Sequence, residues 1–310
     1  MKTNKTMLCV LGSILLCAAA AASAADAPKL TFKFNTTNVP GAVQTYLNNM
    51  NNEDVMVGQY EESSGVYHGY MWKKGEKKPT NLDDPKGTVT SAYNINFNGP
   101  MKVVGVYISK ATHQHMGFLY DAKTKHFKDI RGPKGATASA AEAINDKGWI
   151  VGWYEDASGS YHGFLLRGNT YKTLDVPGAI GTYANGINNK GYIVFGSWTS
   201  STRAGALTKD FGKTYEKIEV PRTGPLGSDA NGINNEDDVT LVWYDSTGLD
   251  RGVLCTKCAS KKKRKFYKFE FEYPKAYQTY ATGINDKHTL ASFYQAEEGD
   301  LWSGYIATFK

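Results

Sequence analysis

One stretch of about fifteen residues occurs six times along this chain, and it restricts the fold more than any other feature. Each copy carries an apolar residue, an asparagine, a turn and a second apolar stretch, as in AINDKGWIVGWY from Ala143. The matching asparagines are Asn51, Asn96, Asn145, Asn188, Asn234 and Asn285, which are 45, 49, 43, 46 and 51 residues apart. Self-similarity at such a period indicates a propeller, a solenoid or a chain of sandwiches.

Each copy continues in the same way, with a polar loop, a strand that begins with glycine and an aromatic residue, a turn and a last strand. Examples are HGYMW from His68, MGFLY from Met116 and YKTLDVPGA from Tyr171. The 20 Tyr, 13 Phe and 32 Gly of the chain suit short strands and turns. Four short strands in about 45 residues are typical of one propeller blade.

The two ends of the chain complement each other. The last copy stops after its third strand, at SGYIATFK, and the segment Leu30–Ala42 parallels Tyr171–Ala179. An N-terminal strand that completes the C-terminal blade would close the ring and remove exposed sheet edges, whereas a solenoid would need polar caps. We therefore predict an all-β fold, a six-bladed β-propeller of four-stranded blades closed by the N-terminal strand.

The N-terminus has the pattern of a secretory signal. Lys2 and Lys5 precede the apolar run Met7–Ala22, and Ala22–Ser23–Ala24 forms a small-residue cleavage site. We expect residues 1–24 to be a signal peptide and 25–310 a single propeller domain of a bacterial protein that is secreted or periplasmic. No later apolar run is long enough to span a bilayer. The expected repeats lie near 38–83, 84–130, 131–174, 175–218 and 219–271, and 272–310 joins 27–37.

The charge balance limits the expected partners. The whole chain has a formal net charge of +6, and loss of Lys2 and Lys5 with the signal would leave +4. This mildly basic balance does not indicate nucleic acid, and we expect a monomer. The basic run Lys261–Lys265 predicts a charged hairpin tip, with an acidic envelope polymer or lipid head group as its alternative partner.

Two cysteines follow the signal, Cys255 and Cys258 in CTKC. In an exported protein they favour a local disulfide. A redox motif would open a helix, and a zinc site would need a second ligand pair, neither of which the sequence offers. His113 and His115 also lack a third ligand, so we expect no metal and no cofactor.

The repeated stretch itself indicates scaffold rather than chemistry. Asparagine suits the first position of the turn, and Gly148 and Gly191 suit the positive φ that follows it. Because six copies of one active residue would be unusual, function is expected where the repeats differ. One such position carries Tyr46, Tyr183, Asp229 and Tyr280, which we predict to form a ligand-binding rim over the propeller axis.

The repeat resembles the bacterial extracellular HAF repeat, most closely in Ala143–Leu166. It departs from the His-Ala-Phe triplet at Gly69 and Gly163, and the histidine is kept only at His68 and His162. The resemblance implies an exported, propeller-like protein. It implies no established reaction, so no catalytic residue is carried over.

Two classes of function remain open, beside the third possibility of a purely structural surface protein without a small ligand. The first is a binding or scaffold module for extracellular or envelope glycans or peptides. The alternative is a hydrolase or lyase that acts on extracellular polysaccharide, because acidic pairs such as Glu61–Glu62 and Glu155–Asp156 could perform acid–base work. A carboxylate beside a histidine or metal at the channel mouth would favour the enzyme, and an aromatic rim would favour binding.

Overall fold

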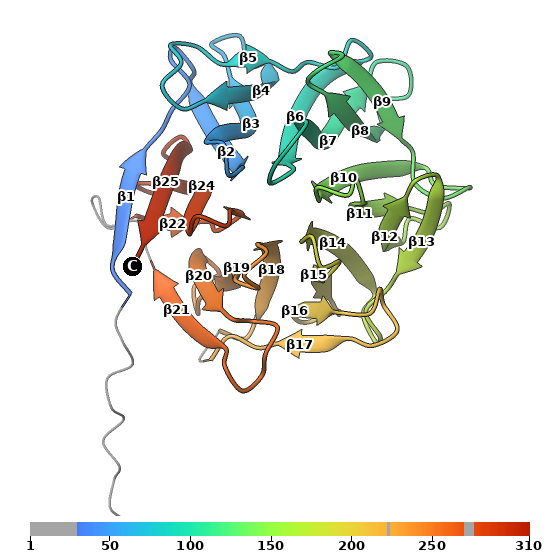
Figure 1. The fold of residues 1–310 in the computed structure, drawn as a ribbon, viewed down its shortest axis with the longest axis vertical. Coiled ribbons are helices and arrows are strands. Elements are labelled where there is room, and N and C mark those ends of the chain that lie inside the picture. Colours follow the sequence, from blue (N-terminus) through green and yellow to red (C-terminus); the bar gives the residue numbers. More distant parts are fainter. Residues whose placement is uncertain (1–29, 222–223, 270–275) are drawn as a thin grey trace, which may run out of the picture. The chain divides into compact units, whose positions relative to one another are not determined.

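The computed structural model describes residues 30–221, 224–269 and 276–310. The predicted signal peptide, residues 1–24, lies outside these residues. Residues Thr31–Lys310 form one compact unit, in which six antiparallel sheets are arranged in a ring (Figure 1). The described residues contain strands and turns but no helix, and so no helix able to cross a membrane. The predicted six-bladed propeller is confirmed.

Each blade runs from an innermost strand near the axis to an outermost strand at the periphery (Figure 1). Blades 1 to 3 consist of β2(Gln44–Met50), β3(Val55–Glu61), β4(Tyr67–Lys73) and β5(Thr80–Asn81); β6(Gly87–Ile95), β7(Lys102–Ser109), β8(His115–Asp121) and β9(His126–Ile130); and β10(Ala138–Ile144), β11(Ile150–Glu155), β12(Tyr161–Arg167) and β13(Thr170–Leu174). Blades 4 and 5 consist of β14(Gly181–Ile187), β15(Ile193–Trp198), β16(Arg203–Thr208) and β17(Glu216–Ile218); and β18(Ser228–Ile233), β19(Val239–Tyr244), β20(Asp250–Thr256) and β21(Lys265–Phe269).

Blade 6 is built from both ends of the chain. Its inner strand is split into β22(Gln278–Thr279) and β23(Gly283–Ile284), followed by β24(Thr289–Gln295) and β25(Ser303–Phe309). The fourth place is taken by β1(Phe32–Thr36), which pairs antiparallel with β25 from Phe32–Phe309 to Thr36–Tyr305. The predicted closure is confirmed, and β25 gains a partner for its outer edge.

The turn of the repeated motif is fixed by its asparagine. In blade 4 the side-chain Oδ1 of Asn188 accepts the backbone N–H groups of Lys190 and Tyr192 at 3.1 and 3.0 Å. Gly191 follows with a φ of 84°, and His288, which occupies this position in blade 6, has a φ of 57°. The predicted Asx-turn is present, and blade 6 carries a histidine in a conformation that favours glycine.

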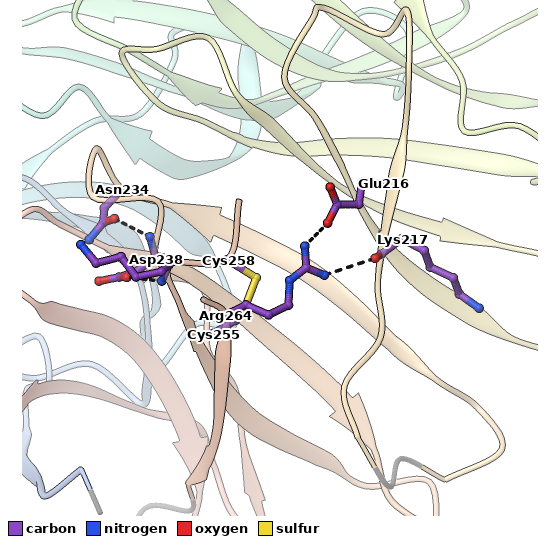
Figure 2. The surroundings of a disulfide bond; sticks show 8 residues. Glu216, Lys217, Asn234, Asp238, Cys255, Cys258 and Arg264 are labelled. Atoms are coloured by element: carbon purple, nitrogen blue, oxygen red, sulfur yellow. Dashed lines mark hydrogen bonds and ion pairs between the residues drawn. A yellow bond between two sulfur atoms is a disulfide. The ribbon is translucent and has the colours of Figure 1, made fainter. Parts of the chain in front are cut away.

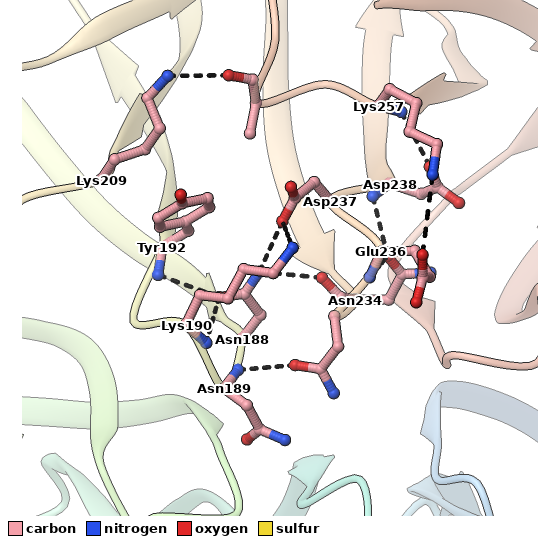
Figure 3. Close-up of polar contacts among 12 residues, drawn as sticks. Asn188, Asn189, Lys190, Tyr192, Lys209, Asn234, Glu236, Asp237, Asp238 and Lys257 are labelled. Atoms are coloured by element: carbon pink, nitrogen blue, oxygen red, sulfur yellow. Dashed lines mark hydrogen bonds and ion pairs between the residues drawn. The ribbon is translucent and has the colours of Figure 1, made fainter.

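The same asparagine also joins neighbouring blades (Figure 3). The amide of Asn188 donates to the backbone oxygen of Asn234 at 3.0 Å, and Asn234 repeats the contact with Asn285 at 3.1 Å. Asn145 donates to Asn188 and Asn285 to Asn51 in the same manner. The motif therefore closes its own turn and bonds to the next blade around the ring.

A second series of contacts, the polar belt, connects all six blades through the residue after the asparagine, or two residues after it in blade 2. Its members are Asn52, Asn98, Asp146, Asn189, Asn235 and Asp286. In blades 2 to 6 the backbone N–H of each member donates to the side-chain oxygen of the member in the next blade. In blade 1 the side-chain amide of Asn52 donates to the side-chain oxygen of Asn98 at 3.1 Å, which completes the belt. The belt ties the blades together at their turn end, the end where the inner strands finish.

Five of the inner strands carry a β-bulge at the same place, just before the turn. The register shifts at Ala141/Ala143 in β10, and the skipped residue is Glu142. The equivalent skipped residues in β2, β6, β14 and β18 are Asn48, Tyr93, Asn185 and Asn231. A bulge leaves its extra residue unpaired and re-aims that side chain. The second strand must approach this point closely, since a Cβ on Gly152 would lie 2.0 Å from the Ala140 carbonyl oxygen.

The core consists of apolar side chains packed between adjacent blades. Between blades 4 and 5, for example, Val194 and Leu207 pack with Ala230 and Leu241, all of them buried. Ile187 and Ile193 belong to the neighbouring cluster between blades 3 and 4. Because each blade buries both faces in this way, the polar bulge residues have only the axis to occupy.

Candidate functional site

A cavity of about 320 Å³ lies on the axis of the ring. All five bulge residues line it, and so does Thr282 of blade 6, which lies between β22 and β23 at the equivalent place. Its wall also contains Tyr183, Arg203, Asp229, Tyr244, Tyr280 and Phe293. The cavity is therefore shared by all six blades, and its volume is at the lower end of the ~300–1,000 Å³ range for small-molecule sites.

Three of the asparagines that line the cavity are held in fixed orientations. The side-chain amides of Asn48, Asn185 and Asn231 donate to the backbone oxygens of Ala92, Ala230 and Ala281, each in the next blade, at 2.9, 2.9 and 3.0 Å. Only the nitrogen of a side-chain amide can donate to a carbonyl oxygen, so these contacts determine which end of each amide carries the oxygen.

A charged cluster occupies the wall between blades 4 and 5. Arg203, at the start of β16, donates through Nε to Oδ2 of Asp229 in β18, and the Tyr244 hydroxyl donates to the same oxygen at 3.1 Å. Oδ1 of Asp229 has no hydrogen-bond partner among the described residues, although the residue is only 6% exposed. Burial raises the pKa of Asp229, and the charge and hydrogen bond of Arg203 partly offset that rise.

A second carboxyl group lies at the bulge of blade 3. Glu142 accepts a hydrogen bond from the indole nitrogen of Trp153 to Oε1 at 2.9 Å. Burial raises the pKa of Glu142 to about 7, and the indole hydrogen bond lowers it only slightly. Glu142 is thus a group that changes charge near neutral pH, on the axis of the molecule.

Aromatic side chains gather around the cavity in two groups. On blades 3 and 4 the ring of Tyr183 stacks on Trp153 at 5.3 Å and meets Trp198 edge-on at 4.9 Å. On blade 6 the ring of Tyr280 stacks on Phe293 at 4.6 Å, and Trp302 packs against both. These groups offer flat apolar faces beside the polar lining.

The structure places three of the four predicted rim residues in the cavity wall. Tyr183, Asp229 and Tyr280 line the cavity, but Tyr46 lies among the aromatic rings behind it, against Phe293 and Trp302. Tyr46, Tyr183 and Asp229 belong to the inner strands rather than to the loops that lead into them, which corrects the expected position. The ring of Phe293, which lines the cavity, meets Tyr46 edge-on at 5.1 Å and stacks with Tyr280 at 4.6 Å.

Sequence reasoning missed the bulge residues and Arg203. The bulge position differs between the copies, which carry Asn48, Tyr93, Glu142, Asn185, Asn231 and Thr282. This variation among polar residues within an apolar strand was the available signal. Arg203 belongs to the third strand of its blade and pairs with Asp229 of the next blade, so no signal in one repeat could locate it.

The remaining candidate groups lie away from the cavity. No group of three or more His, Cys, Asp or Glu within the described part of the chain could hold a metal ion. Cys255 and Cys258 form the predicted disulfide, which is fully buried beside β20 (Figure 2). Arg264 of the basic run bonds to Glu216 of blade 4, so only Lys261, Lys262, Lys263 and Lys265 form the exposed basic tip.

His68 and His162 occupy equivalent positions at the starts of β4 and β12, and each lies between two carboxylates. His162 contacts Asp175 through Nδ1 at 2.9 Å and Asp156 through Nε2 at 3.2 Å. Burial lowers the pKa of His162, but the hydrogen bonds and charges of Asp175 and Asp156 together outweigh burial and raise it above its usual value. The pKa of His68 is raised by Asp83 and Glu62 against the same opposing effect of burial.

Because the pKa values of His68 and His162 are raised, we expect the protein to lose stability as the pH rises through neutrality. A group with a raised folded-state pKa stabilises the protein fully below its unfolded pKa, about 6.5 for His, and this contribution disappears as the pH rises through the folded value. The free energy of unfolding should therefore fall between about pH 6 and pH 8, and less steeply in a His68→Gln/His162→Gln variant. Denaturant titrations across this range measure it. The exposed His126→Gln change is the control, and an unchanged slope in the double variant would contradict the assignment.

The fold and the axial cavity define the class of the protein as a six-bladed β-propeller whose central cavity is large enough for a small molecule. Three solved structures of similar architecture are AofleA from Arthrobotrys oligospora, Trypanosoma rangeli sialidase and TolB from Acinetobacter baumannii. Their identities are 13%, 11% and 10%, with TM-scores of 0.55, 0.55 and 0.51. The matches cover 90%, 91% and 87% of this chain and 86%, 59% and 68% of the respective chains.

At these identities the likeness shows a common fold, and this chain spans about three fifths of the sialidase. No protein-family model matches the chain, and no curated protein matches it. The function therefore has to be argued from the cavity itself.

Proposed function

We propose that the protein is an exported propeller that binds an extracellular or envelope glycan in its axial cavity. The observation that carries this proposal is the lining of the cavity, in which flat aromatic rings stand beside fixed amides from blades 1, 4 and 5 and carboxyl groups from blades 3 and 5. Sugar rings present apolar C–H faces and hydroxyl edges, which suit such a wall. The resemblance to HAF repeats supports export.

The cavity chemistry favours binding over catalysis. No histidine is present among the described residues that line the cavity. A hydrolase remains the second candidate, because Glu142 has a pKa raised to about 7 by burial and shares the cavity with Asp229. Similar architecture occurs in Trypanosoma rangeli sialidase, which has been solved in complex with sialic acid. This likeness supports a glycan ligand, and it names no substrate for the present chain.

The aromatic walls give the direct test of glycan binding. A glycan array selects a ligand for the wild-type protein, and calorimetry then measures its dissociation constant with a Tyr183→Ala/Tyr280→Ala variant. We expect affinity to fall by about thirtyfold to several hundredfold, because two aromatic contacts are lost and each contributes roughly 1–2 kcal/mol. Chromatography of the incubated ligand reports hydrolysis in the same samples.

Tyr171→Ala is the matched control, because Tyr171 is a partly buried tyrosine of β13 outside the cavity. Equal affinity of the wild-type protein and the double variant, with thermal unfolding unchanged, would refute binding in the axial cavity. Release of shortened sugars by the wild-type protein but not by Glu142→Gln would favour the hydrolase.

A further inference from the structure

Two amides on opposite sides of the axial cavity present hydrogen-bond acceptors to it. The amide nitrogens of Asn48 and Asn185 are occupied by backbone oxygens of the next blade. Among the described residues no hydrogen bond reaches Oδ1 of either side chain, so the oxygens are the ends left for a ligand. Both amides therefore call for groups that donate hydrogen bonds.

The two carboxyl groups of the cavity have the same requirement. The side chain of Asp229 is 9% exposed, and its Oδ1 has no partner within the described part of the chain. Glu142 uses Oε1 for the indole of Trp153. A buried polar atom left without a partner costs about 1–3 kcal/mol, so a donor placed at Oδ1 of Asp229 would stabilise the complex.

The charge of the cavity favours a cation. Of the acidic and basic residues in its lining, Arg203 is already paired with Asp229, which leaves the carboxyl of Glu142 in excess. At the rim end, where the inner strands begin, the loops 62–66, 156–160 and 296–302 of blades 1, 3 and 6 contain acidic residues but no Lys or Arg, whereas loop 110–114 of blade 2 carries Lys110. The acidic loops of blades 1, 3 and 6 attract cationic ligands to their side of the rim.

The acceptors surround a molecule rather than an ion. Asn48 belongs to blade 1 and Asn185 to blade 4, which lie opposite each other in the ring (Figure 1). They face a volume of about 320 Å³, whereas a calcium site needs six to eight oxygens at roughly 2.3–2.6 Å from one point. A ring-shaped ligand with several donors matches acceptors that are spread in this way, and its faces match Tyr183 and Tyr280.

We infer that the ligand of the axial cavity is an amino sugar with a free, protonated amine. This inference rests on the proposed glycan binding and adds the chemical class of the glycan. The ammonium group donates to Asp229 and Glu142, while ring hydroxyls donate to Asn48 and Asn185. The ammonium also lies beside the aromatic walls, which attract cations.

Calorimetry with three matched oligosaccharides tests the inference. The probes are a β-1,4-linked glucosamine tetramer, its fully N-acetylated form and an oligogalacturonate, at about pH 7 with a chelator present. We expect the glucosamine tetramer to bind about tenfold or more tightly than the N-acetylated form, and the oligogalacturonate not to bind. Asp229→Asn and Glu142→Gln should each weaken binding of the tetramer by about tenfold, because each replaces a carboxyl group that can pair with the ammonium as a carboxylate by a neutral amide.

Glu53→Gln is the control, since it removes the same charge from an exposed turn outside the cavity, at the end of the propeller opposite the rim. Glu142→Gln keeps the oxygen that accepts from Trp153, so it serves even if Asp229→Asn destabilises the fold. Equal or tighter binding of the N-acetylated form would overturn the amino-sugar class and leave glycan binding intact. Binding of tetralysine as tight as the tetramer, binding that requires calcium, or unaltered affinity in both variants would also overturn it. No binding of any glycan would refute the proposed function itself.

Discussion

Deletion of Phe32–Thr36 is expected to lower the melting temperature by about 10 °C or more and to make the protein prone to aggregation. The strand β1 pairs with β25 along five residues and supplies Phe32 and Phe34, which pack against Phe269 and Tyr305. Loss of two partly buried phenylalanines costs roughly 3–6 kcal/mol, and the bare edge of β25 becomes a template for pairing with other chains. Thermal unfolding with light scattering measures both effects.

Lys33→Ala is the control for this deletion, because Lys33 lies in the same strand but is exposed. It should shift the melting temperature by no more than about 2 °C. Phe34→Ala should fall between the two. If the deletion variant unfolds at the same temperature as the wild-type protein, β1 does not close the ring in solution.

Asn188→Ala is expected to reduce the free energy of unfolding by about 2–4 kcal/mol. The side chain is fully buried and serves the N–H groups of Lys190 and Tyr192 and the backbone oxygen of Asn234. Truncation leaves these groups unpaired in a place that water cannot reach, at about 1 kcal/mol or more for each. Equilibrium denaturation in urea measures the change.

Asn51→Ala provides the matched comparison for this substitution. Asn51 accepts the N–H groups of Glu53 and Val55 as Asn188 accepts its own, but its amide nitrogen has no partner among the described residues. Its replacement should therefore cost about 1 kcal/mol less than that of Asn188. Equal losses in the two variants would mean that the contact between blades contributes nothing to stability.

The difference between these asparagines originates in blade 2. There the turn is two residues longer. Oδ1 of Asn96 accepts the N–H of Lys102, six residues later in the sequence, whereas Oδ1 of Asn51 accepts the N–H of Val55, four residues later. Asn52 instead donates its backbone N–H to the oxygen of Phe97. The extra residues in Asn96–Lys102 are evident from the sequence. Their effect on Asn51, whose amide nitrogen has no partner among the described residues, is evident only from the structure.

Only some of the residues that line the axial cavity could be predicted from the sequence. Variation among the repeats directed attention to Tyr183, Asp229 and Tyr280, which line the axial cavity, since residues that differ between copies do not serve the common scaffold. The bulge could not be foreseen, because it depends on the register between two strands and not on either strand alone. From the sequence alone, Glu142 is a charged residue within an apolar strand, and nothing indicates that its side chain lines the axial cavity.

The sequence by itself determined the number of blades, the strand composition of each blade, the turn chemistry of Asn188 and Gly191, and the closure by β1. These features follow from the local periodicity, which recurs in every repeat, and from the match between the two ends of the chain. Tertiary structure alone decided that Arg203 meets Asp229, that Tyr46 lies behind Phe293, and that the free amide oxygens belong to the axial cavity. The physical reason is that these contacts join different blades or depend on register, so their geometry exists only once the ring is closed.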